Sequence, residues 1–151
     1  MSLDEAFLDV TEAVAYGQDP VLLAKDLRKH IKSNLGLTIS IGVATNKSVA
    51  KIASDMDKPD GLTVVDPGTE CDFLAPLSVG KLWGIGPKMS SLLAHQGIRT
   101  IGQMTDRPED WWIGTLGKLG PQIRKLALGR DDRPVVISRE RKSISAETTL
   151  N

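Results

Sequence analysis

The chain has 151 residues, of which 40% are hydrophobic and 25% are charged, and its 19 basic and 19 acidic residues cancel. These values fit one ordinary globular domain or two small ones. We expect neither a transmembrane helix nor a secretory signal, because no apolar run approaches the ~18 residues of a membrane span and no basic-then-apolar segment opens the chain. A single cysteine, Cys71, cannot form an internal disulfide and predicts a reducing cytoplasm as the location.

The first ten residues alternate in polarity and predict a half-buried β-strand, with Ala6, Leu8 and Val10 on one face. Two adjacent carboxylates, Asp4 and Glu5, stand at the start of this strand. Neighbouring side chains of a regular strand point to opposite faces, so both acids serve one site only at a turn or a strand end. An ordinary solvated strand end fits the same pair.

A helix is predicted from Pro20 to Leu35, because Asp19 is a good N-cap, proline fits the first turn and Gly36 fits the stop. Its apolar side chains recur every four residues and predict a buried row (Leu23, Leu27, Ile31 and Leu35). The basic side chains of the same helix are expected on a solvated face (Lys25, Arg28, Lys29 and Lys32).

Residues 37–43 alternate large apolar with small side chains and predict a strand. Its small face lets another group approach closely (Thr38, Ser40 and Gly42). Asn46 is expected to cap a second helix that runs to about Met56. The inward side of this helix is predicted from its apolar positions (Val49, Ile52, Ala53 and Met56).

Residues 58–61 read Lys-Pro-Asp-Gly and predict a turn in which Gly61 takes a positive φ. A short strand is predicted after it, over residues 62–65, which completes an α/β or α+β layer. Lys58 in this turn either reaches an anion or is an ordinary exposed lysine.

The second half of the chain predicts a different organisation. We place a domain boundary near Pro76, beyond which glycines separate short predicted helices (residues 78–82, 87–96, 100–104, 109–116 and 121–128). Trp111 and Trp112 are expected in the core of this helical part. Residues 142–150 alternate and predict a further strand.

The zero net charge hides an asymmetry along the chain. Residues 1–76 carry 7 basic and 12 acidic residues, whereas residues 117–151 carry 8 basic and 4 acidic residues. An acidic half suits metal ions and a basic half suits phosphates, which predicts two modules with different roles. A soluble surface explains the modest basic excess almost as well.

Residues 82–88 read Leu-Trp-Gly-Ile-Gly-Pro-Lys, the pattern of a helix-hairpin-helix. The glycines Gly84 and Gly86 let backbone N–H groups approach a phosphate, and the N-terminus of the next helix adds its positive end. Lys88 supplies a mobile charge beside them. Such a unit holds a DNA backbone without reading bases. The alternative is a tight turn between packed helices, with Ile85 as a core plug.

Taken in order, these motifs resemble the Y-family, or translesion, DNA polymerases, and most closely the DNA polymerase IV branch. The resemblance starts at residues 2–10, which look like the second acidic motif of the family. It continues in the family's order and spacing over essentially the whole chain (residues 41–44, 46–47, 50–56, 58–61, 84–86 and 142–144).

This resemblance implies a function and a set of site residues. Asp4 and Glu5 would help to hold two Mg²⁺ ions for template-directed nucleotidyl transfer past damaged DNA, with primer–template DNA and a deoxynucleoside triphosphate as partners. Lys58 would contact the incoming triphosphate. The hairpin would bind primer phosphates (Gly84, Ile85, Gly86 and Lys88).

The same resemblance implies an α+β fold in three parts. Residues 1–76 would be a partial palm, with an antiparallel or mixed sheet and two helices. Residues 77–138 would be the small all-helical thumb that contains the helix-hairpin-helix. Residues 139–151 would be the linker and the first strand of the little finger. It further implies a bacterial, nucleoid-associated protein without a membrane partner, and a sliding clamp bound through regions outside this sequence.

Several family features have no counterpart in this sequence, including the fingers and the first palm strand with its metal-binding aspartate. We therefore expect that the isolated chain does not extend a primer. Three interpretations stay open: a fragment of a translesion polymerase, a non-catalytic module that binds the DNA backbone, and a structural fragment without DNA affinity.

Overall fold

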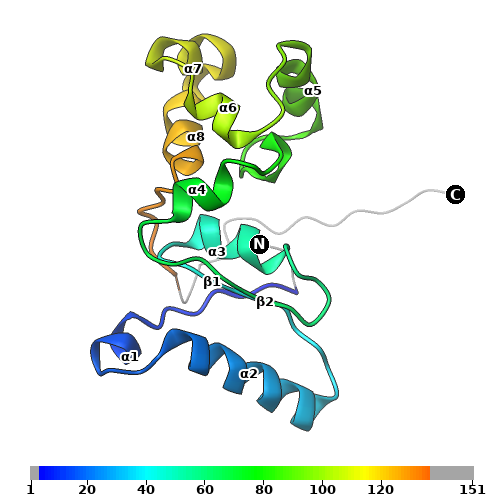
Figure 1. Cartoon of the computed structure of the whole chain (residues 1–151), viewed down its shortest axis with the longest axis vertical. Helices are drawn as coiled ribbons and strands as arrows, with labels where there is room; N and C mark the ends of the chain where they lie inside the picture. Colours follow the sequence, from blue (N-terminus) through cyan, green and yellow to red (C-terminus); the bar gives the residue numbers. More distant parts are fainter. Residues whose placement is uncertain (1–3, 137–151) are drawn as a thin grey trace, which may run out of the picture.

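The computed structural model describes residues 4–136 and consists of an α/β part followed by a helical part (Figure 1). The α/β part lies at one end of the molecule, and helices α5 to α8 lie at the other. The elements in chain order, with η for a 3₁₀-helix, are α1 (Thr11–Ala15), α2 (Pro20–Leu35), β1 (Ile41–Val43), α3 (Lys47–Ser54), β2 (Leu62–Val64), α4 (Glu70–Leu74), η1 (Val79–Lys81), α5 (Pro87–His95), α6 (Ile101–Thr105), α7 (Glu109–Leu116), η2 (Gly117–Leu119) and α8 (Gly120–Ala127).

The two strands of the described sheet, β1 and β2, run parallel, with Ile41 opposite Leu62. Helix α3 connects them and packs on β1 at Gly42, where a Cβ atom would overlap the carbonyl oxygen of Ala50. The small face predicted for this strand is therefore filled by a helix of the same chain. The predicted α+β class is confirmed, but within residues 4–136 the sheet is parallel and neither antiparallel nor mixed, because a helical crossover connects its two strands.

Helix α2 begins and ends where its cap residues predict. The Asp19 carboxylate accepts a hydrogen bond of 2.7 Å from the Val21 N–H, and Gly36 ends the helix. Its surface differs from the prediction. The predicted buried row is only half-buried at Leu23, Leu27 and Ile31, and Leu35 in the last turn is 66% exposed. Arg28 is half-buried in a contact described below.

The predicted strand over residues 1–10 is absent from its described part, residues 4–10. A strand requires hydrogen bonds to a neighbouring strand, and no described strand pairs with this segment. Asp9 instead accepts hydrogen bonds from the Thr11 N–H and hydroxyl at 3.0 and 2.6 Å, at the start of the unpredicted helix α1. The strand predicted over residues 142–150 lies outside the described residues.

Helix α3 is shorter than predicted and ends at Ser54. Val49, Ile52 and Ala53 are buried as expected, but Met56 is 44% exposed because it follows the end of the helix. Helix α4 was not anticipated from the sequence, since its five residues carry too little periodicity to be recognised.

One hydrophobic core runs through both parts of the molecule. It includes Val49 and Ile52 from α3 together with Leu74, Ile101 and the fully buried Trp112 from the helical part. The expected core position of Trp112 is confirmed. The boundary near Pro76 stays a prediction, and the side chains on its two sides pack together rather than in separate cores.

Candidate functional site

The segment after the N-terminus, helix α3 and the turn before β2 meet in a chain of alternating charges. Glu5 pairs with Lys51 at 2.8 Å, and Lys51 pairs with Asp55 at 2.7 Å. Asp55 in turn pairs with Lys58 at 2.5 Å. The structure thus links two predicted site residues, Glu5 and Lys58, through Lys51 of α3 and its C-cap residue Asp55, whose roles the sequence analysis missed. Their i, i+4 spacing on a helix was the available signal.

This network changes the ionisation of its central pair. Burial alone would raise the pKa of Asp55, but hydrogen bonds from Lys51 and Lys58 outweigh it and lower that pKa below its ordinary 3.8. Burial alone would lower the pKa of Lys51, but hydrogen bonds from Asp55 and Glu5 raise it above 10.5. Lys51 and Asp55 are therefore both charged at neutral pH.

The pH dependence of stability follows from these directions. A carboxyl whose pKa is lower in the folded state stabilises the fold above its unfolded value, and this contribution is lost as the pH falls through the folded value. We therefore expect the free energy of unfolding to decline below pH 3.8, partly through Asp55. Urea denaturation from pH 2 to 6 should show a shallower decline for Asp55→Asn. The exposed Asp26→Asn on α2 is the control, and equal slopes in the two variants would contradict the assignment.

The Lys58–Gly61 turn is present, but its positive φ lies at Asp60 (57°) and not at Gly61. Gly61 is instead required for close packing, since a Cβ atom there would overlap the carbonyl oxygen of Asp57. Aspartate tolerates the left-handed region better than most residues, which explains how it replaces glycine at this position.

The predicted hairpin lies between η1 and α5. Gly84 has a φ of 95°, and Gly86 is the N-cap of α5, with its carbonyl accepting a bond of 2.9 Å from the Ser90 N–H. Ile85 is 6% exposed and fills the core, while Lys88 is exposed on the first turn of α5. Ile85 therefore packs into the core, as the alternative of a tight turn between packed helices predicts. Gly84, Gly86 and Lys88 nevertheless lie on the surface.

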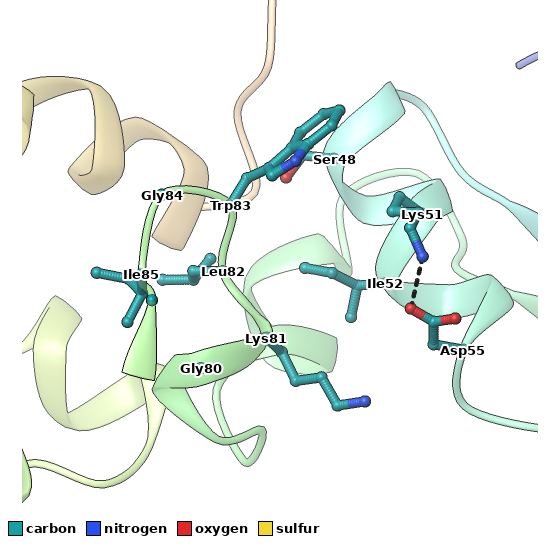
Figure 2. A pocket seen from close by; sticks show the side chains of 11 residues that line it. Ser48, Lys51, Ile52, Asp55, Gly80, Lys81, Leu82, Trp83, Gly84 and Ile85 are labelled. Carbon is teal, nitrogen blue, oxygen red and sulfur yellow. Dashed lines mark hydrogen bonds and ion pairs between the residues drawn. The ribbon is translucent and has the colours of Figure 1, made fainter. Parts of the chain in front are cut away.

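An open pocket of about 460 Å³ lies between α3 and this hairpin (Figure 2). Lys51 and Asp55 line its α3 side, joined by their ion pair. Residues 80–86, which include Lys81, line the opposite side. The charge network and the hairpin, predicted as separate signals, therefore face one space.

The hairpin is also held by an aromatic and cationic stack that the sequence did not indicate. The rings of Phe7 and Trp83 lie 6.4 Å apart, with Lys47 5.9 Å from the Phe7 ring centre and Arg133 4.5 Å from that of Trp83. Asp131 fixes the guanidinium of Arg133 through two hydrogen bonds of 2.6 and 2.8 Å. Four segments far apart in sequence meet here.

The start of α3 adds two bonds to the segment after α8. The Asn46 side chain caps α3 through the Val49 N–H and donates to the Gly129 carbonyl at 2.8 Å. The Lys47 ammonium donates to the Pro134 carbonyl at 2.7 Å. The predicted cap is confirmed, and its amide group also connects the two parts of the molecule.

The described residues do not form a complete metal centre by themselves. Within residues 4–136 no three His, Cys, Asp or Glu side chains gather in a way that could hold an ion. Asp4 and Glu5 are adjacent, and Glu5 already pairs with Lys51. Carboxylate oxygens are of the type that a hard cation takes, and these two residues alone do not make a whole site. No helix in the same range is long and apolar enough to span a membrane.

The amino-acid sequence of the chain is similar to sequences of known proteins. Residues 1–55 match the impB/mucB/samB family. The chain is 42% identical over its full length to the DNA polymerase IV of Marinomonas sp. (strain MWYL1), of which it covers 43%. It is 44% identical over 99% of its length to the DNA polymerase IV of Methanoculleus marisnigri, of which it covers 41%.

Solved structures agree. The post-insertion binary complex of Dbh DNA polymerase matches 85% of the chain with a TM-score of 0.75 and 32% identity, and the chain covers 38% of that protein. DinB from Sulfolobus solfataricus matches 85% of the chain with a TM-score of 0.74 and 29% identity, again with 38% coverage. The chain is thus similar over its length to DNA polymerase IV relatives and to solved Y-family DNA polymerases, and it spans about two fifths of their length.

Proposed function

We propose that the chain is part of a translesion DNA polymerase and supplies two catalytic carboxylates, a triphosphate-binding lysine and a DNA-binding hairpin. The observation that carries this proposal is the pocket that α3 and the hairpin share, with the charge network that includes Glu5 and Lys58 extending from one of its walls. A site for nucleotidyl transfer needs both parts close together, because the primer end and the incoming nucleotide must meet.

Homology to DNA polymerases implies a divalent metal cofactor, for which we propose Mg²⁺ and the ligands Asp4 and Glu5. Hard carboxylate oxygens suit this ion. Glu5 pairs with Lys51 at 2.8 Å, so a cation bound by Glu5 would compete with the Lys51 ammonium group. Because the described residues offer only this pair, we propose that the isolated chain binds Mg²⁺ weakly and does not extend a primer.

We propose that Lys58 contacts the triphosphate of the incoming deoxynucleotide. Its side chain is 53% exposed, and within residues 4–136 its ion pair is with Asp55. An exposed ion pair contributes little to the stability of the fold. The Lys58 ammonium group can therefore leave the Asp55 carboxylate and bind a phosphate at a small cost in free energy. The pair with Asp55 holds Lys58 close to α3 until then.

We propose that the hairpin binds primer phosphates through the backbone N–H groups near Gly84 and Gly86 and through Lys88. The buried Ile85 side chain anchors the loop in the core and leaves its backbone outside.

We propose that the chain consists of a partial palm (1–76), a thumb (77–138) and the linker with the first little-finger strand (139–151), and that it belongs to a cytoplasmic, nucleoid-associated protein. A sliding clamp is proposed to bind the complete polymerase.

DNA binding is tested by titrating the chain with a primer–template duplex at 50 to 300 mM salt. We expect weak, sequence-indifferent binding whose logarithm falls linearly with the logarithm of salt concentration. Lys88→Glu should weaken binding and reduce this slope by about 1, as for the loss of one phosphate contact. Lys118→Glu, an equal charge change on η2 outside the pocket, is the control.

The same samples separate the three interpretations. No measurable binding at low salt would favour a structural fragment, and equal effects of the two lysine variants would exclude the hairpin as the contact. Addition of Mg²⁺ and deoxynucleotides should give no templated extension. Extension by the pure chain that is lost in Asp4→Ala would show instead that the described carboxylates suffice for catalysis.

A further inference from the structure

The turn that carries Lys58 is held by helix α2, thirty-two residues earlier in the chain. One guanidinium nitrogen of Arg28 donates to the backbone oxygen of Asp60 and, at 2.9 Å, to its carboxylate. Lys32, one turn further along α2, pairs with the other carboxylate oxygen at 3.2 Å. Two basic residues expected to face solvent therefore converge on one aspartate.

The Arg28 contact is more than a surface ion pair. The Arg28 side chain is only 24% exposed, and its Nε atom is buried without a hydrogen-bond partner within residues 4–136. A buried donor without a hydrogen-bond partner costs free energy. If the Arg28 side chain moved into solvent, water would bind the Nε–H group and this cost would disappear. The two hydrogen bonds to Asp60 must offset this cost, and because one of them goes to a backbone oxygen, they hold the main chain of the turn as well as the Asp60 side chain.

The opposite side of the turn is attached to the strand β1. The Gly61 N–H donates to the Ser40 hydroxyl at 3.1 Å, and the Gly61 carbonyl accepts from the Ile41 N–H at 3.0 Å. The backbone around Asp60 therefore has one anchor on α2 and another on β1. The Lys58 side chain, 53% exposed, projects from this doubly anchored turn.

We infer that Arg28 and Asp60 are positioning residues, which fix the Lys58 turn so that the ammonium group meets a bound triphosphate. The inference rests on the proposed role of Lys58. A lysine on a flexible turn would lose both backbone and side-chain conformational entropy when it binds a triphosphate. In an anchored turn the backbone entropy is already lost on folding, so binding costs less free energy. The alternative is that Arg28 acts only through its positive charge.

Binding of inorganic tripolyphosphate to the full chain, measured by isothermal titration calorimetry, distinguishes these alternatives. Arg28→Lys keeps the charge but loses the planar guanidinium that reaches the backbone oxygen and one carboxylate oxygen of Asp60. We expect it to weaken binding about fivefold, within the range for residues that act through a neighbour. Lys29→Ala, which removes a charge from the same helix without touching the turn, is the control and should change binding less than twofold.

For the variant Asp60→Gly the two alternatives predict opposite changes in tripolyphosphate affinity. The substitution removes a negative charge from the turn, and glycine tolerates the φ of 57° at this position. If charge alone mattered, tripolyphosphate would bind more tightly to this variant, whereas loss of the anchor predicts weaker binding. Tighter binding would therefore overturn the inference even if Arg28→Lys failed to fold.

Lys58→Ala separates failure of this inference from failure of the proposed function. Unchanged binding in Lys58→Ala would remove the proposed triphosphate role and the inference with it. Weaker binding in Lys58→Ala with unchanged binding in Arg28→Lys would overturn the inference alone. A lower melting temperature of Arg28→Lys with unchanged affinity at 15 °C would also overturn it, because the contact would then serve stability only.

Discussion

Replacement of Trp112 by alanine is expected to lower the free energy of unfolding by about 3–5 kcal/mol, the usual cost of deleting a large aromatic side chain from a core. Trp112 has no exposed surface, and its ring stands edge-on to that of Trp111 with centres 5.4 Å apart. Its indole N–H donates to the Arg107 carbonyl at 3.3 Å. The variant would lose these contacts together, which is a large part of the stability of a small domain.

The change is measured by urea denaturation followed by far-ultraviolet circular dichroism, since tryptophan fluorescence changes with the substitution itself. Ile113→Ala is the matched control, because Ile113 follows directly on α7 and is 55% exposed. We expect this control to lose less than about 1 kcal/mol. A similar loss in both variants would show that Trp112 does not hold the core together.

Replacement of Gly42 by alanine is expected to destabilise the fold by about 3 kcal/mol, at the upper end of overpacking effects. The added Cβ atom would overlap the Ala50 carbonyl oxygen and lie 2.9 Å from the Ala53 Cβ. Backbone atoms cannot move aside as a side chain does, so α3 would have to shift away from β1. Because α3 carries Lys51 and is followed directly by its C-cap Asp55, the charge network would shift with it.

Gly114→Ala makes the same chemical change where space is available. No atom lies within 4 Å of the Cβ position at Gly114, which lies inside helix α7. Alanine there should stabilise the fold by about 0.5–1 kcal/mol through helix propensity. Opposite signs in the two variants, measured by thermal denaturation, would confirm the close contact of α3 with β1; two stabilised variants would contradict it.

Local signals predicted much of the fold. Asp19 and Gly36 gave both ends of α2, and Asn46 gave the start of α3, because caps depend on a few adjacent residues. The small face at Gly42 also predicted a close neighbour, although not which one. The hairpin was predicted from its glycines and the proline that opens α5.

The remaining features depend on partners far along the chain. The alternation of residues 4–10 predicted a strand, but a strand also needs a neighbour that the local pattern cannot supply. The contact of Arg28 with Asp60 was missed for a similar reason, since a basic residue on a helix usually faces solvent. Asp4, Glu5 and Lys58 came from family resemblance, and their roles remain proposals.

The hydrogen bonds at the start of α3 have a consequence for the order of folding. The bonds from Asn46 to Gly129 and from Lys47 to Pro134 join residues 83 and 87 positions apart. Closing so long a loop costs chain entropy, whereas α7 and α8 are neighbours in sequence and can pack early. We expect these two bonds to form after the folding barrier and to slow unfolding, so they govern how long the native state persists rather than how quickly it is reached.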